Sequence, residues 1–243
     1  MKFHQLFLGI TGAALACVAA PASAAVVFDS ITYSPESRFG GFNLTPAIAT
    51  NTGSTGRFAA SGTDTVTNSN VSFLTYCIDI ATGFATYNSY EIRSLSTVIS
   101  DTVKRQQLAG LILNADPLIG TAATETEARD IAAAIGLAIW EIIYEDRTIG
   151  YDVSDGAGAF SVWGDFASLK TRTNSYLANV TTGVWTGDAN RLSALVSLDG
   201  KSQNQVFISS PVPEPETWVQ LIFGLGVAGV ALRRRRQRGA LTA

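Results

Sequence analysis

The stretch TETEARDIAAAIGLAIWEIIYE, residues 124–145, decides the fold. Ile131, Ile135, Ile139 and Ile142 recur at intervals of three and four residues, which places them on one face of an α-helix. The stretch also opens with the Thr-x-x-Glu pattern of a capping box, which marks a helix start. We therefore predict one long helix here, packed through its apolar face against a sheet.

Shorter apolar segments flank this helix on both sides. The last two predicted strands surround Asp199-Gly200, a dipeptide typical of hairpin turns. Two further helices are predicted, one over residues 103–114, ending before Pro117, and one over residues 166–177. The predicted strands are residues 26–28, 42–44, 57–59, 71–80, 87–95, 192–198 and 205–209. The sum predicts an α+β domain over residues 25–209: a β-sandwich or barrel-like sheet with an inserted helical section.

The first 24 residues have the pattern of a secretory signal peptide. Lys2 precedes an apolar run over residues 6–20, and the run ends before the small residues Ala22-Ser23-Ala24. We predict cleavage before Ala25 and export of the mature chain. Two alternatives are a buried core helix and a lipoprotein signal through Cys17.

The other end of the chain has three parts in a fixed order. A linker over residues 210–216 contains Pro213-Glu214-Pro215 and is followed by an apolar stretch over residues 217–232. The arginines that follow are Arg233, Arg234, Arg235, Arg236 and Arg238. An apolar helix stopped by arginines is typical of a membrane span whose arginine end lies in the cytoplasm. We predict a single C-terminal transmembrane helix and arginine cluster over residues 217–238.

VPEPETWVQLIFGLGVAGVALRRRRQR resembles the PEP-CTERM tail, with Pro213, Glu214 and Pro215 as the signature and Arg233 to Arg236 as the cluster. The resemblance implies recognition by an exosortase, a membrane protease-transpeptidase of Gram-negative bacteria that make exopolysaccharide. It further implies a precursor anchored in the inner membrane, then a place at the cell surface or in the extracellular matrix of a biofilm. The alternative is an ordinary anchor helix that is never processed.

Cysteine and histidine counts limit the chemistry of the mature chain. Without the signal peptide, Cys77 is the only cysteine and no histidine remains. A Ser-His-Asp triad, a Cys-His dyad, a disulfide framework and a histidine-based zinc site are therefore excluded. No stretch has the spaced acidic residues of an EF-hand loop, so we expect no metal and no cofactor. Since no basic stripe with interleaved aromatic residues is present, we expect no nucleic-acid partner.

Two segments carry a second resemblance, to the Cys-Gln thioester domains of bacterial surface adhesins. Thr75-Tyr76-Cys77-Ile78-Asp79 and the segment IGLAIW at residues 135–140 are similar to the two motifs of those domains. The resemblance implies a thioester between Cys77 and position 136, but that position is Gly136, which has no side chain to supply the acyl group. We therefore predict a degenerate site without a thioester, and Cys77 as a small buried residue on a central strand. Glycine in mid-helix costs about 1 kcal/mol relative to alanine, which predicts a close approach to Gly136 by the strand that carries Cys77.

Three functions remain open from the sequence. The first is a non-catalytic exported protein of the surface or the exopolysaccharide matrix, with a structural or adhesive role. The second is a carboxylate-dependent glycoside hydrolase acting on matrix polysaccharide, although Glu141 and Glu145 more plausibly form the solvated edge of their helix. The third is a covalent adhesin that uses Cys77 with a partner other than position 136. Trp163 and Trp185 either stack on sugars or pack against the domain.

Overall fold

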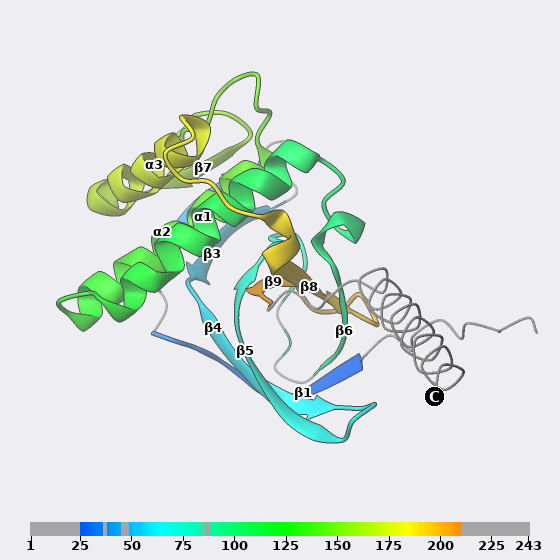
Figure 1. Cartoon of the computed structure of the whole chain (residues 1–243). Helices are drawn as coiled ribbons and strands as arrows, with labels where there is room; N and C mark the ends of the chain where they lie inside the picture. The colour runs from blue at the N-terminus through cyan, green and yellow to red at the C-terminus, as the bar shows by residue number, and fades with distance from the viewer. Residues whose placement is uncertain (1–24, 36–37, 45–48, 84, 86–87, 210–243) are drawn as a thin grey trace, which may run out of the picture.

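The computed structural model describes residues 25–35, 38–44, 49–83, 85 and 88–209. Within them, six antiparallel strands close into a barrel in the order β1-β4-β5-β9-β8-β6. Figure 1 shows the helices gathered on one side of this barrel. The barrel strands are β1 (Ala25–Tyr33), β4 (Phe58–Asp64), β5 (Ser69–Cys77), β6 (Asn88–Ser94), β8 (Leu192–Ser197) and β9 (Gln205–Ile208). The barrel-like sheet that the sequence predicts is confirmed.

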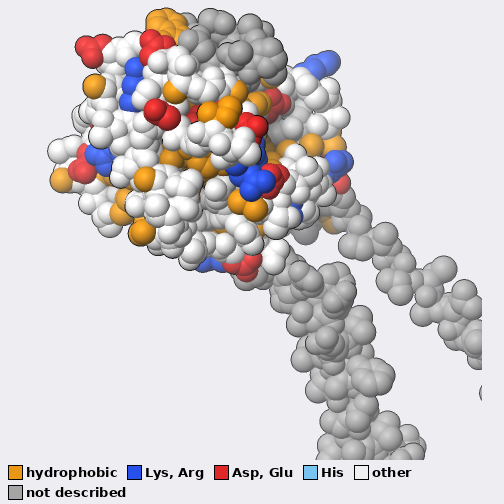
Figure 2. All heavy atoms as spheres, turned by 90° about the horizontal axis from the view of Figure 1, so that it is seen from above, with side chains coloured by type: hydrophobic (Ala, Val, Ile, Leu, Met, Phe, Trp, Pro, Cys, Tyr) orange, Lys and Arg blue, Asp and Glu red, His pale blue; other side chains and the backbone are white. Residues whose placement is uncertain are grey.

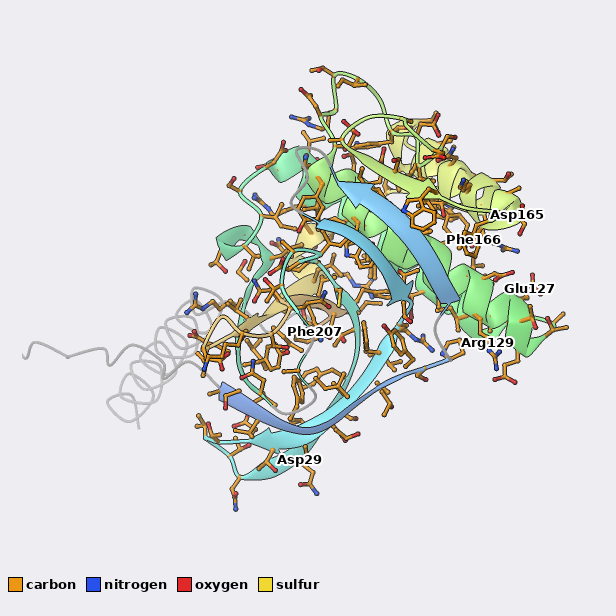
Figure 3. All side chains as sticks on the ribbon, turned by 180° about the vertical axis from the view of Figure 1, so that it is seen from behind. Asp29, Glu127, Arg129, Asp165, Phe166 and Phe207 are labelled. Atoms are coloured by element: carbon orange, nitrogen blue, oxygen red, sulfur yellow. The ribbon has the colours of Figure 1, made fainter. Side chains whose placement is uncertain are left out.

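Aromatic side chains fill the barrel. Phe28, Phe73 and Phe207 come from three different strands, with ring centroids 5.9 Å apart for Phe28 and Phe73 and 4.8 Å apart for Phe73 and Phe207. Tyr90 of β6 packs on Phe28 at 5.2 Å, and Figure 3 shows Phe207 within the ring of strands. Since side chains alternate along a strand, the pairing of Thr75 with Phe207 fixes which residues face inward.

A second, three-stranded sheet lies with the helices, in the order β3-β2-β7. Helix α2 contacts α1, α3, all three strands of this sheet and β5 of the barrel. It therefore runs through the middle of the domain. The remaining elements are β2 (Arg38–Leu44), β3 (Ala49–Thr55), β7 (Phe160–Trp163), α1 (Thr102–Gly120), α2 (Glu125–Tyr144), α3 (Ala167–Thr181) and the 3₁₀ helices η1 (Leu95–Thr97) and η2 (Ala189–Arg191).

Helix α2 is buried on every side over its central three turns. Each residue from Ile131 to Ile142 is buried, and a helix that is apolar all round belongs inside a protein. Its start has the predicted cap: Glu127 N donates to Thr124 Oγ1 at 3.1 Å, and Glu127 Oε2 accepts from Ala123 N at 3.0 Å. The prediction of this helix is confirmed, although the sequence indicated one buried face and the structure buries all of them.

A polar cluster connects α1 to the barrel. Asp116 of α1 accepts from Tyr76 Oη at 2.7 Å and from Arg57 Nη1 at 3.0 Å. The Arg57 and Asp116 side chains are only 13% and 17% exposed, so water screens this ion pair less than an exposed one. Arg57 Nε also donates to the Ser34 carbonyl oxygen. The cluster holds α1 at a fixed position over β4 and β5.

Two sequence predictions about the elements were incomplete. Helix α1 continues through Pro117 to Gly120, because a proline in the last turn removes only one helical hydrogen bond. Strands β3 and β7 were not predicted, since ATNTGST lacks the alternation of apolar and polar residues that marks a strand and FSVW has only four residues.

The predicted signal peptide, linker and transmembrane helix, residues 1–24, 210–216 and 217–238, lie outside the described residues. Among the residues that the structure does describe, no helix has both the length and the apolar character needed to cross a membrane.

Gly136 has the predicted close neighbour, but its identity was predicted wrongly. A Cβ atom built at Gly136 would overlap Thr55 Oγ1, at the end of β3. Thr55 is 3% exposed, and its hydroxyl has no hydrogen-bond partner among the described atoms. The strand that requires a glycine here is therefore β3, and not β5, which carries Cys77.

We predict that Gly136→Ala lowers the free energy of unfolding by about 1–2 kcal/mol, because overpacking against Thr55 outweighs the gain in helix propensity. In a Thr55→Ala background the same substitution becomes neutral or stabilising, by up to about 1 kcal/mol. Urea unfolding of the four proteins of this double-mutant cycle measures the coupling. An equal loss in both backgrounds would contradict the assigned contact.

Candidate functional site

Cys77 lies at the end of β5 and faces the barrel interior. It pairs with Gln205 of β9 across the sheet, so the two side chains are on the same face. The Cys77 thiol donates to Gln203 Oε1 at 2.6 Å, while Thr75, one inward position earlier, donates to Gln205 Oε1. Two glutamine side chains thus surround a cysteine that is 5% exposed.

Burial controls the chemistry of this thiol. Desolvation raises the pKa of Cys77 far above its ordinary value, and the nearby charge of Asp79 raises it further. Because the thiolate is the reactive form, a thiol with a raised pKa is a poor nucleophile. In the described conformation Cys77 is therefore an interior residue whose thiol hydrogen-bonds to Gln203 and whose surroundings disfavour the thiolate.

The two residues of the degenerate thioester site have different partners. Cys77 contacts Gln203 inside the barrel, and Gly136 on α2 lies against Thr55 of β3. A glutamine at position 136 would direct its side chain into the space that Thr55 occupies. Sequence patterns could not reveal Gln203, since only the antiparallel pairing of β9 with β5 brings it to Cys77.

A pair of buried carboxylates lies at the end of α2. Glu141 is 0% and Glu145 1% exposed, so the prediction that they form a solvated helix edge is wrong. The loop that follows α2 folds back over them and supplies backbone donors. Glu141 Oε1 accepts from Asp152 N at 2.8 Å, and Glu145 Oε2 accepts from Ala159 N and Phe160 N.

Glu141 has an unusual environment for a carboxyl group. Its Oε2 atom is buried and has no hydrogen-bond partner among the described residues. Burial raises the pKa of Glu141 to about 8, the charges of Glu145 and Asp152 raise it as well, and the Asp152 N–H and Lys104 oppose the rise. Glu141 is therefore protonated at neutral pH.

The carboxylate pair does not have the arrangement of a hydrolase site. Glycoside hydrolysis needs two carboxyl groups that face each other across a cleft. Glu141 and Glu145 come from one helix and bind the backbone of one loop. Two hollows on the described part of the chain, of about 570 and 440 Å³, have other linings. Over the same residues, no group of three or more His, Cys, Asp or Glu side chains could hold a metal ion.

We predict that Glu141→Gln stabilises the protein increasingly as the pH rises from 4.5 to about 8. Over this range the wild-type unfolded chain releases a proton that the folded protein keeps, so the wild type loses stability and the variant does not. Below this range the two proteins are equally stable. Near pH 8 the variant is more stable by roughly 2 kcal/mol, a value set below the full free energy that corresponds to the pKa difference of Glu141 between the folded and unfolded states.

Glu145→Gln is the matched control. Both oxygens of Glu145 accept backbone N–H groups, and the amide nitrogen of glutamine cannot accept. This variant should lose stability at every pH. Unfolding in urea over a series of pH values measures both; a Glu141→Gln curve parallel to the wild type would contradict the buried, protonated carboxyl group.

Comparisons with known proteins give one match at the C-terminus and one for the domain. Residues 211–236 match the model of the PEP-CTERM protein-sorting motif. A solved structure, the thioester domain of the Staphylococcus aureus TIE protein, is similar over 78% of this chain and 80% of that chain, at 11% sequence identity and a TM-score of 0.38. A likeness of this size carries no inference about chemistry, and no curated protein matches the sequence. The motif is the signal for exosortase processing of a membrane-anchored precursor, which then reaches the cell surface. Residues 211–236 therefore identify the chain as an exported protein that carries the PEP-CTERM sorting motif.

Proposed function

We propose that this protein is a non-catalytic component of the cell surface or the exopolysaccharide matrix of a Gram-negative bacterium, with a structural or adhesive role in the biofilm. The match of residues 211–236 to the sorting motif carries the proposal. The precursor is held in the inner membrane by the apolar segment within residues 217–238. An exosortase then removes this segment near Pro213-Glu214-Pro215.

The described domain supports this role through its surface and its core. Figure 2 shows one face on which Lys and Arg side chains are scattered among Asp and Glu, without a basic stripe. The raised pKa of Glu141 is explained by burial, and its Oε1 atom accepts a hydrogen bond from the backbone of the loop that covers it, so this carboxyl group has a structural role. A closed barrel with buried polar contacts suits a scaffold.

One contact supports a second candidate, a covalent adhesin with a thioester between Cys77 and Gln203. The two side chains meet at 2.6 Å between Sγ and Oε1. In this step the Cys77 sulfur bonds to Cδ of Gln203, the bond from Cδ to the amide nitrogen breaks, and the thiol proton leaves with ammonia. The raised pKa of Cys77 opposes the step, because the thiolate is scarce. The scaffold role is therefore the better supported of the two.

The intact mass of the mature protein, purified from its own host, tests both candidates. We predict a chain that begins at Ala25, ends near Pro213-Glu214-Pro215 and has lost no ammonia. A control in which these three residues are replaced by alanine should keep the complete tail, because the exosortase no longer recognises it.

Two other results would change the proposal. A mature wild-type chain that keeps Arg233 to Arg236 would make it a simple anchored protein and refute sorting. A mass deficit of one ammonia, removed by methylamine and absent in Gln203→Ala, would establish the thioester. The matched control Gln205→Ala should retain any such deficit, since Gln205 Oε1 hydrogen-bonds Thr75 rather than Cys77.

A further inference from the structure

A hollow of about 440 Å³ lies between the start of α1 and the connection that follows α3. Figure 1 shows this connection passing across α1 on its way to η2 and β8. Gln106 and Gln107 line the hollow from α1, and Thr181, Trp185 and Thr186 line it from the other side. Two valines and a glycine complete the lining. The volume is within the range of pockets for small ligands.

The connection that carries Trp185 is fixed to α1 by a close backbone approach and by hydrogen bonds. A Cβ atom at Gly110 would lie 2.7 Å from the carbonyl oxygen of Trp185, so only glycine permits this approach. Asn114 Nδ2 donates to the carbonyl oxygens of Gly110, at 2.7 Å, and of Thr186, at 3.0 Å. The backbone N–H of Trp185 donates to the Asn179 carbonyl oxygen at 2.9 Å. These contacts hold the connection in place without a ligand, which lowers the entropic cost of binding one.

The indole ring of Trp185 is held as well. Tyr176 of α3 packs against it, with ring centroids 5.0 Å apart and an angle of 45° between the planes. Tyr176 is 6% exposed, while Trp185 is only partly buried and lines the hollow. Trp185 therefore offers a supported aromatic surface at the edge of a polar pocket. The packing of Trp185 on the domain, one of the two alternatives from the sequence, is therefore confirmed, and stacking on a sugar stays a prediction.

The chemistry of the lining selects a neutral ligand. None of the lining residues carries a charge, so the hollow has nothing to neutralise a phosphate, a carboxylate or an ammonium group. Its amides donate and accept hydrogen bonds. Thr181 Oγ1 donates to the Leu177 carbonyl oxygen at 2.9 Å, which leaves this hydroxyl as an acceptor. Gln107 Oε1 accepts from Tyr151 Oη at 2.7 Å, which leaves its amide nitrogen as a donor. A sugar ring has the matching properties: hydroxyl groups around its edge and an apolar C–H face that lies flat on an indole.

We propose that this hollow binds a neutral saccharide unit, with the sugar face on Trp185 and the hydroxyl groups on Gln106, Gln107 and Thr181. The inference rests on the proposed extracellular role and gives that role a ligand class. The site lies within the described domain, apart from the sorting tail. Sugar binding and tail processing therefore succeed or fail independently.

The test is a titration of the mature protein with neutral gluco-, manno- and galacto-oligosaccharides. Binding is measured by calorimetry and through the indole N–H signals in NMR spectra. We expect at least one series to bind with a dissociation constant of about 1 mM or below and to shift the Trp185 signal. Trp185→Ala should weaken binding by about tenfold or more. Trp163→Ala, which removes an exposed tryptophan on β7 outside the hollow, should leave binding unchanged.

Gln106→Ala provides a second variant, since Gln106 is exposed and its removal does not disturb the core. It should weaken binding while the unfolding midpoint stays the same. The proposal is overturned if no neutral oligosaccharide shifts the Trp185 signal. It is also overturned if Trp185→Ala and Gln106→Ala bind as the wild type does. The intact mass of the same preparation reports separately on sorting.

Discussion

The complete burial of α2 is the constraint on which the rest of the structure depends. Each residue from Ile131 to Ile142 lies inside the domain, so the helix needs cover on all sides. The barrel strand β5, helices α1 and α3 and the sheet β3-β2-β7 supply that cover. The glycine at position 136 is a consequence, because β3 can cover this side only where the helix has no side chain. The burial of Glu141 and Glu145 is a second consequence, because backbone N–H groups of the covering loop donate hydrogen bonds to their side chains.

This arrangement gives the two thioester-like segments structural roles in the domain. The IGLAIW segment forms the centre of the buried helix, and Cys77 lies in the barrel interior against Gln203. Both segments therefore contribute packing, and the position of the missing glutamine is filled by Thr55. The surface features that suit a ligand lie elsewhere, at the junction of α1 with the connection after α3. A scaffold that presents such a hollow outside the cell agrees with the sorting motif at residues 211–236.

Elements with a local signal could be predicted from the sequence. Features that depend on contacts between distant segments could not. Helix α2 has a strong apolar repeat and a capping box, and most barrel strands follow turn residues, so these elements were predicted. Strand β3 is held by its pairing with β2 and its contact with Gly136, neither of which is visible in ATNTGST. Glu141 and Glu145 were assigned to solvent because the helix alone does not show the loop that covers them. Gln203 was missed for the same reason, since it reaches Cys77 only through the register of β9 on β5.

Native-state hydrogen exchange of the purified protein tests the central role of α2 most directly. Amides in the most stable part of a protein exchange only through global unfolding. We expect the amides of Ile131 to Ile142 to exchange with the free energy of global unfolding measured in urea, more slowly than those of α3. Exchange of these amides through a local opening, at a free energy well below the global value, would contradict it.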